Sequence, residues 1–407
     1  MFEWEFSEIV GEWKGYRVGS VRRVVGEAGR ESVHIELLGG EALMQCSGCQ
    51  AWVERVHETT RRWVRDLPIL GAQTHLLVYR RRVKCVRCGP KLEALSWLTA
   101  YGRVTRRLAE SVARLCKVLP VKHVAEHYGL GWDTVKAIDK AFLHEELGPV
   151  DFSGVELLAM DEFALHKGHR YATVVVDAPR KRVLWVGRGR GRDDVRPFFR
   201  LLGEQGCQQI RAVAIDMNAA YELEVRAHYQ HAEVIYDLFH VVAKYGREVI
   251  DRVRVDEANR LRQDRTARQV VKGSRWLLLR NRENQSRDER VRLQELLDAN
   301  RALMTVYILK DDLKHLWSYR YRAAAVKFWK AWYARAVRSR IKPLVRFAKR
   351  LKPYLQGIFA HCRYPLNTSL IEGINNKIKV IKRMAYGFRD DDYFFLKIRA
   401  AFPGIPG

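Results

Sequence analysis

Three acidic residues in the second half of the chain have the types and settings of a two-metal catalytic site. Asp161 follows the run ELLAM and Asp216 follows IRAVAI, so each is expected at the end of a buried strand. Glu372 stands near the start of a predicted helix. Carboxylates converging from two strands and one helix could hold two divalent ions about 3.5 to 4 Å apart, the arrangement used for in-line phosphoryl transfer. Taken alone, either aspartate is more typical of a turn or a helix cap.

The stretch SLIEGINNKIKVIKRMAYGFRD, which holds Glu372, reads as an amphipathic helix. The residues that form its apolar stripe are Ile371, Ile374, Ile378 and Ile381. At about 100° per residue, a second, polar face carries Glu372, Asn376, Lys379 and Arg383. Glu372 has no basic residue three or four positions away, so a local ion pair does not explain it. We expect Glu372 to be a metal ligand and Lys379 and Arg383 to follow a DNA backbone.

Other groups near these acids have weaker claims. Asp237 and His240, in YDLFH, follow the last predicted core strand, where they either line the metal site or form a hydrogen-bonded core pair. Four tryptophans of the helical region either stack on unpaired bases or pack between helices: Trp276, Trp317, Trp329 and Trp332.

Four cysteines in two CxxC pairs predict a structural zinc site. Cys46, Cys49, Cys85 and Cys88 can direct four thiolates at one ion, and reduced cysteines without a metal are the alternative. Cys116, Cys207 and Cys362 are isolated, which is typical of core packing. A basic stretch between the pairs either meets phosphates or forms an ordinary solvated strand face; its residues are Arg61, Arg62, Arg65, Arg80, Arg81, Arg82 and Lys84.

The segment VKHVAEHYGLGWDTVKAIDKAFL predicts a helix-turn-helix. Its first helix ends at Gly129, and Asp133 is expected to cap a second helix. That helix would present Thr134, Lys136 and Lys140 to a DNA groove, although a plain helical hairpin has the same pattern. We expect residues 46–146 to bind DNA without the rest of the chain.

Composition points to a polyanionic partner. The 407 residues contain 73 Lys and Arg against 47 Asp and Glu, a net charge of +26, and nucleic acid is the leading candidate. No apolar run approaches the roughly 20 residues of a membrane span, and the acidic N-terminus is unlike a signal peptide. We therefore expect a cytoplasmic protein without a membrane partner.

The order of patterns predicts a multidomain α/β protein. Residues 1–40 have a possible strand at SVHIELLG and an unknown role, 41–100 form a zinc-binding module, and 101–148 a helix-turn-helix domain that ends in a Leu-Gly-Pro linker. Short β-rich runs between amphipathic segments make 149–240, with 366–407, an α/β core. Long helical stretches rich in Arg, Lys and Trp occupy 241–365.

The motifs and their order resemble those of bacterial insertion-sequence transposases of the ISL3 family. In chain order these motifs are CxxC…CxxC, the helix-turn-helix, MDEFALHKGHRYATVVVD, AIDMNAAY, YDLFHVV and IEGINNKIKVIKRMAYGF. The resemblance covers nearly everything from residue 46 onward. It implies an N-terminal zinc ribbon and a ribonuclease H-like mixed-sheet core with an Asp-Asp-Glu triad, at the matching positions Asp161, Asp216 and Glu372. It also implies a helical insertion between the second Asp and the Glu.

The expected function is a DNA transposase that binds the terminal inverted repeats of its element and cuts and joins strands with Mg²⁺ or Mn²⁺. Partners would be those repeats, target DNA and further copies of the chain, because two ends must be brought together. An inactive DNA-binding regulator or a structure-specific nuclease with the same core are the alternatives.

Overall fold

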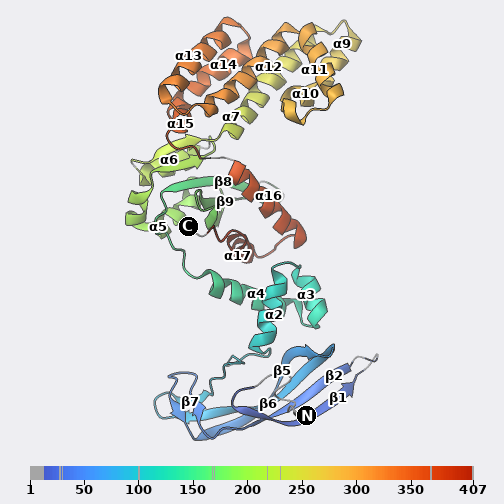
Figure 1. The fold of residues 1–407 in the computed structure, drawn as a ribbon, viewed down its shortest axis with the longest axis vertical. Coiled ribbons are helices and arrows are strands. Elements are labelled where there is room, and N and C mark those ends of the chain that lie inside the picture. Colours follow the sequence, from blue (N-terminus) through green and yellow to red (C-terminus); the bar gives the residue numbers. More distant parts are fainter. Residues whose placement is uncertain are drawn as a thin grey trace, which may run out of the picture. The chain divides into compact units, whose positions relative to one another are not determined.

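The computed structural model describes residues 13–26, 29, 31–99, 101–166, 168, 170–217, 219–229, 231–366 and 369–405. Two compact units make up the chain (Figure 1). Unit 1 contains the residues up to Gly148 together with Ile381–Leu396, and unit 2 contains Pro149–Val380 together with Lys397–Gly407. The division falls after Gly148, within the Leu-Gly-Pro segment predicted as a linker.

Unit 1 begins with a five-stranded sheet. Its strand order is β1 (Tyr16–Val25), β2 (Glu31–Gly39), β6 (Ala72–Cys85) and β5 (Val56–Ile69), with β7 (Gly89–Leu92) on β6. The strands β2 and β6 are parallel and the other pairs are antiparallel. Residues 16–39 therefore belong to the same sheet as the zinc module, where the sequence suggested a separate segment. Two short strands, β3 (Met44–Gln45) and β4 (Trp52–Val53), form a hairpin beside it.

One face of this sheet is a hydrophobic core. Alternate residues of β2 and β6 point into it, because side chains alternate along a strand, and Trp13, Trp97 and Leu98 cover them. The core residues contributed by the three long strands are Ile35, Leu37, Val64, Leu76 and Val78.

Three helices follow as the predicted helix-turn-helix. They are α2 (Arg106–Cys116), α3 (Val121–Tyr128) and α4 (Trp132–Leu147). Gly129 ends α3 in the left-handed conformation at φ 59°, as expected. The prediction that Asp133 caps the second helix was wrong by two residues. Gly131 is the N-cap of α4, and Asp133 lies in the first turn of that helix. An acid there still interacts favourably with the helix dipole.

Unit 2 contains a second, mixed sheet. Its order is β10 (Arg182–Arg188), β9 (Arg170–Asp177), β8 (Leu157–His166), β11 (Ala212–Ile215) and β12 (Glu233–Tyr236). The strand β9 is antiparallel to its neighbours, whereas β8, β11 and β12 are parallel. The helices α5 (Arg192–Gln209) and α6 (Ala219–His228) connect its strands. This is the mixed-sheet core that we expected.

A helical region interrupts the core after β12. It starts with α7 (Leu238–Tyr245), continues through a π-helical turn (Gly246–Ile250) into α8 (Asp251–Arg260), and adds α9 (Arg265–Gly273), α10 (Arg275–Leu279), α11 (Arg287–Ala299), α12 (Arg301–Lys314), α13 (Arg322–Arg338), α14 (Lys342–Leu351) and α15 (Leu355–Ala360). The predicted boundary at residue 241 falls inside α7, because Asp237 caps that helix. The chain ends with α16 (Ser369–Met384) and α17 (Asp391–Ala401). Among the described helices none combines the length and apolar content needed to cross a bilayer.

Candidate functional sites

Three aspartates lie at the same level on adjacent strands of the mixed sheet. The parallel register pairs Ala214 with Ala159 on one side, and Ile215 with Tyr236 on the other. Continued by two residues, the β11–β8 register aligns Asp216 with Asp161. Continued by one residue, the β11–β12 register aligns Asp216 with Asp237. Aligned residues of parallel strands point to the same face, about 4.8 Å apart per strand. The carboxyl edge of the sheet therefore presents three carboxylates in one row.

The expectation that Asp161 ends its strand was wrong. β8 runs on to His166, and Asp161 pairs with Val174 of β9. The strand continues past Asp161 because β8 keeps pairing with its antiparallel neighbour β9 as far as His166. On the other side, the pairing of β8 with β11 ends at Ala159. Asp161 thus remains at the edge on the side that faces Asp216.

The row of aspartates is electrostatically crowded. Asp161 is 8% exposed, and this burial raises the pKa of its carboxyl group to about 6, with further raising by the charges of Asp216 and Asp237. His240 Nε2 opposes this shift, at 4.0 Å from Asp161 Oδ1 and 3.9 Å from Asp237 Oδ2. Asp237 also caps α7, because its Oδ1 accepts from the Phe239 N–H at 2.6 Å. A cation at this edge would relieve the crowding.

Helix α16 contacts the row through a residue that the sequence analysis missed. Asn375 Nδ2 donates to Asp161 Oδ2 at 2.7 Å. Asn375 lies three positions after Glu372, so the two side chains are neighbours on the helix surface. Its place one helical turn after Glu372 was the indication that the sequence offered. The predicted polar face of α16 is exposed, with Glu372, Asn376, Lys379 and Arg383. Of the predicted apolar stripe, Ile371, Ile374 and Ile378 are buried, whereas Ile381 is half-buried.

A cleft of about 1000 Å³ within unit 2 is lined by two of the three aspartates and by residues of α16, whereas Asp216 is not among its lining residues. Asp161, Asp237, His240, Glu372 and Lys379 all line it, together with residues of the helical insertion. The cleft thus contains acids from the sheet edge and from α16.

The donor set suits a hard divalent cation. Carboxylate and amide oxygens are the ligands that Mg²⁺ and Mn²⁺ prefer. Asn375 Oδ1 is buried and has no hydrogen-bond partner among the described residues. The carboxylates are spread along the cleft, however: within the described part of the chain, only four cysteines form a group of three or more ligand residues whose atoms lie within 4.8 Å of one another.

Those cysteines are Cys46, Cys49, Cys85 and Cys88, so the structure brings the predicted zinc ligands together. Cys49 Sγ and Cys85 Sγ are 3.5 Å apart. Four sulfurs at 2.3 Å from one zinc ion stand about 3.8 Å apart in a tetrahedron, which is close to this spacing. Cys46 and Cys85 are buried with Met44 and Val83, so the site is part of a small core.

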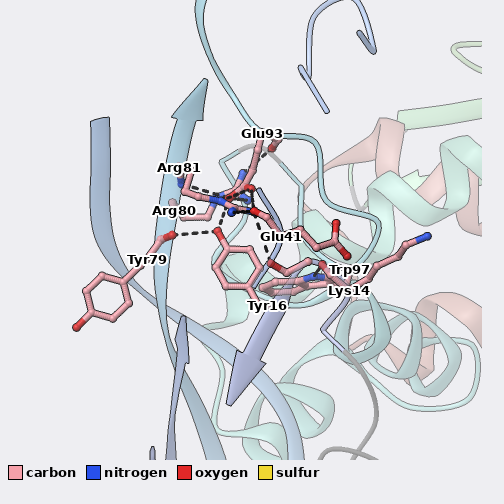
Figure 2. Close-up of polar contacts among 9 residues, drawn as sticks. Lys14, Tyr16, Glu41, Tyr79, Arg80, Arg81, Glu93 and Trp97 are labelled. Atoms are coloured by element: carbon pink, nitrogen blue, oxygen red, sulfur yellow. Dashed lines mark hydrogen bonds and ion pairs between the residues drawn. The ribbon is translucent and has the colours of Figure 1, made fainter. Parts of the chain in front are cut away.

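The prediction that Arg80 and Arg81 contact phosphates was wrong (Figure 2). Arg80 is 1% exposed, with its guanidinium beside Glu93, because strand alternation turns it to the same side as Val78. Arg81 pairs with Glu93 at 2.7 Å and donates to the Glu41 carbonyl at 2.7 Å. Tyr16 completes the network by donating to the Tyr79 carbonyl at 2.9 Å. Both arginines thus stabilise the sheet. Arg82 is half exposed and pairs with Glu58.

The lysines of α4 are engaged within unit 1. Lys136 Nζ and Lys140 Nζ lie 2.9 Å and 3.2 Å from the same Asp390 oxygen. A hydrogen bond from the Tyr393 backbone N–H and, after it, the contacts with Lys136 and Lys140 hold the pKa of Asp390 well below its usual range. The hydroxyl of Tyr393 also bonds to buried Asp139. Thr134 is exposed at the start of α4, whereas the two lysines bind residues 381–396.

One of the four tryptophans lies in the cleft. Trp317, Trp329 and Trp332 are buried between helices, while Trp276 is 65% exposed and lines the cleft that holds Asp161. A hydrogen bond from the helical insertion holds its helix α10 in place: buried Lys310 Nζ donates to the Leu278 carbonyl at 2.7 Å. Burial lowers the pKa of Lys310 to about 8.

Comparison with family models agrees with this architecture. Residues 158–398 match a family described as "Transposase", residues 93–143 match the "Helix-turn-helix domain of transposase family ISL3", and residues 42–88 match the "zinc-finger of transposase IS204/IS1001/IS1096/IS1165". The chain therefore belongs to the ISL3 family of DNA transposases.

Individual relatives are similar over most of their length. The transposase for insertion sequence element IS1001 of Bordetella parapertussis is 56% identical over 405 residues, 99% of each chain. The transposase for insertion sequence element IS1557 of Mycobacterium tuberculosis is 27% identical over 396 residues, 90% of this chain and 88% of that protein.

Proposed function

We propose that this transposase cuts and joins the ends of its insertion sequence with Asp161, Asp216 and Glu372 as ligands of two Mg²⁺ or Mn²⁺ ions. The observation that carries the proposal is the row of sheet-edge aspartates, contacted through Asn375 by the helix that bears Glu372. When bound, the ions would activate water or a 3′-hydroxyl and stabilise the leaving oxygen.

The surrounding residues have positioning roles. Asn375 orients the Asp161 carboxylate through its 2.7 Å hydrogen bond to Oδ2, while Oδ1 accepts from the Glu162 backbone N–H at 2.8 Å. His240 lies between Asp161 and Asp237, where it can hold a water or a proton. Lys379 and Arg383, exposed one and two turns after Asn376, would hold the DNA backbone.

The zinc module and helix-turn-helix would bind the terminal inverted repeats. We assign one structural zinc ion to the four cysteines, whose thiolates leave no open position for water. Thr134 would face the groove and Arg82 a phosphate, whereas Lys136 and Lys140 could reach DNA only if Asp390 were displaced. Simultaneous capture of two ends requires at least a dimer, and such a protein would act in the cytoplasm.

The test is strand joining by purified protein. A labelled terminal-repeat duplex with flanking DNA is incubated with Mg²⁺ and a supercoiled target plasmid. Cleavage at the repeat boundary and transfer of label to the plasmid are expected, and both should vanish with EDTA while duplex binding persists. Binding without cleavage would favour an inactive regulator, and cleavage that follows junction structure rather than the repeat would favour a nuclease.

Trp276→Ala should slow cleavage roughly tenfold, because base stacking on an exposed tryptophan contributes 1–3 kcal/mol. The indole would support a base unpaired beside the cut. A duplex with a mismatch at that position should restore much of the rate, and Trp276→Phe should cut nearly as well as the parent. Single-turnover cleavage measures all three. An unchanged rate for Trp276→Ala would place the tryptophan outside the DNA path.

A further inference from the structure

The outward face of the N-terminal sheet is basic. Cross-strand pairing puts Arg22, His34, His75 and Arg65 in one line over four strands. Next to this line, Trp63 is 50% exposed, and its ring is 5.0 Å from that of His34. Arg61 and Arg17 belong to the same face by register. The hydrophobic core covers only the opposite face.

The cations of this face have few partners of their own. Arg17, Arg22 and Arg61 are exposed and form no ion pair with any residue in the described ranges. The acid registered beside them, Glu36, accepts hydrogen bonds from Ser20 at 3.0 Å and Tyr79 at 2.8 Å. A sheet face with unneutralised arginines suits a polyanion.

The face continues into the helix-turn-helix. Arg65 donates to the carbonyls of Tyr128 and Gly129 at 2.8 Å and 3.1 Å, at the C-terminus of α3. Beside this junction, a groove of about 630 Å³ is lined by Gln73 of the outward face together with Lys122 and Trp132. Trp132 is the first residue of α4. The N-terminal end of a recognition helix is the part that reaches base edges.

We propose that this outward face, with Arg22 and Arg61 as its phosphate contacts, binds the DNA backbone next to the segment read by α4. The inference rests on the proposed binding of terminal repeats. It assigns a role to β1 and β2. It also supplies phosphate contacts that Lys136 and Lys140 do not offer while they are paired with Asp390. The occupant is duplex DNA, since contacts to phosphates need no particular base.

The experiment measures binding of the full chain to a terminal-repeat duplex and to a scrambled duplex between 50 and 300 mM salt. Arg22→Ala/Arg61→Ala should weaken binding to both duplexes by the same factor, roughly tenfold at physiological salt, and should lower the slope of log K against log salt by about 1.8, or 0.9 for each phosphate contact. Arg22→Lys/Arg61→Lys should stay close to the parent.

The matched control removes equal charge elsewhere. Arg23→Ala/Arg260→Ala alters two exposed arginines that already pair with Glu31 and Glu257, and Arg23 alternates with Arg22 to the other face of β1, so its affinity should stay within about twofold of the parent. An equal loss in this control would reduce the effect to net charge and overturn the proposal. An unchanged salt slope in Arg22→Ala/Arg61→Ala would also overturn the proposal. So would a variant that binds DNA like the parent but differs from it in oligomeric mass without DNA, because the face would then be a contact between copies of the chain. A parent chain that binds both duplexes equally would refute terminal-repeat recognition instead.

Discussion

Glu372→Gln is expected to reduce cleavage of a terminal-repeat duplex by at least about 10³-fold while leaving repeat binding intact. The amide keeps the size and hydrogen-bonding reach of the side chain but removes the charge that a hard divalent ion requires. Metal stabilisation of the transition state contributes several kcal/mol, and each 1.36 kcal/mol is tenfold in rate. Asp161→Asn and Asp216→Asn should behave in the same way in a nicking assay with Mg²⁺ or Mn²⁺.

Glu162→Gln is the matched control for this loss. Glu162 lines the same cleft but pairs with Arg190 at 2.6 Å, so its neutralisation should change cleavage only slightly. If Glu372→Gln cuts like the parent while the two aspartate variants are inactive, the third ligand is elsewhere. Asp237 would then be the candidate, because the sheet register already aligns it with Asp216.

Cys46→Ser/Cys85→Ser should lose the zinc ion and with it the folded N-terminal module. One zinc per chain is expected in the parent by elemental analysis, and none in the variant. Structural zinc contributes about 10–16 kcal/mol of binding free energy, which exceeds the stability of a small domain. The module should therefore unfold, and terminal-repeat binding should fall below detection at concentrations that saturate the parent.

Cys362→Ser serves as the comparison, because that cysteine lies outside the cluster, in unit 2. Its zinc content and DNA affinity should equal those of the parent. A parent protein purified without chelators that contains no zinc, or a double variant that retains it, would contradict the assignment.

Local patterns were predicted well from the sequence. The faces of α16 follow from helix periodicity alone, and the cysteine spacing identified the group that the structure brings within 4.8 Å. Arg80 shows why a phosphate contact cannot be predicted from the number of basic residues in a segment alone. In the run YRRRVKC, strand periodicity places Arg80 on the side of Val78 and Leu76 and so marks it as buried. The same period would also bury Arg82, which is exposed because the buried positions shift to Val83 and Cys85 after Arg80.

Contacts distant in sequence could not be predicted. β2 pairs with β6 some forty residues later, so residues 16–39 gave no sign that they complete the zinc module. Asp390 lies 250 positions from Lys140, and only tertiary structure shows that it occupies both lysines of α4. A fragment of residues 46–146 would lack β1, β2 and residues 381–396, which belong to the same unit.

The discontinuity of unit 1 also sets the order in which the protein can mature during synthesis. Residues 381–396 leave the ribosome only after the whole of 149–380, so the carboxylate of Asp390 reaches Lys136 and Lys140 last. A nascent or prematurely terminated chain therefore displays a recognition helix with two uncompensated lysines. Only a chain translated beyond Asp390 neutralises them, which couples the surface charge of the DNA-binding unit to completion of the catalytic one.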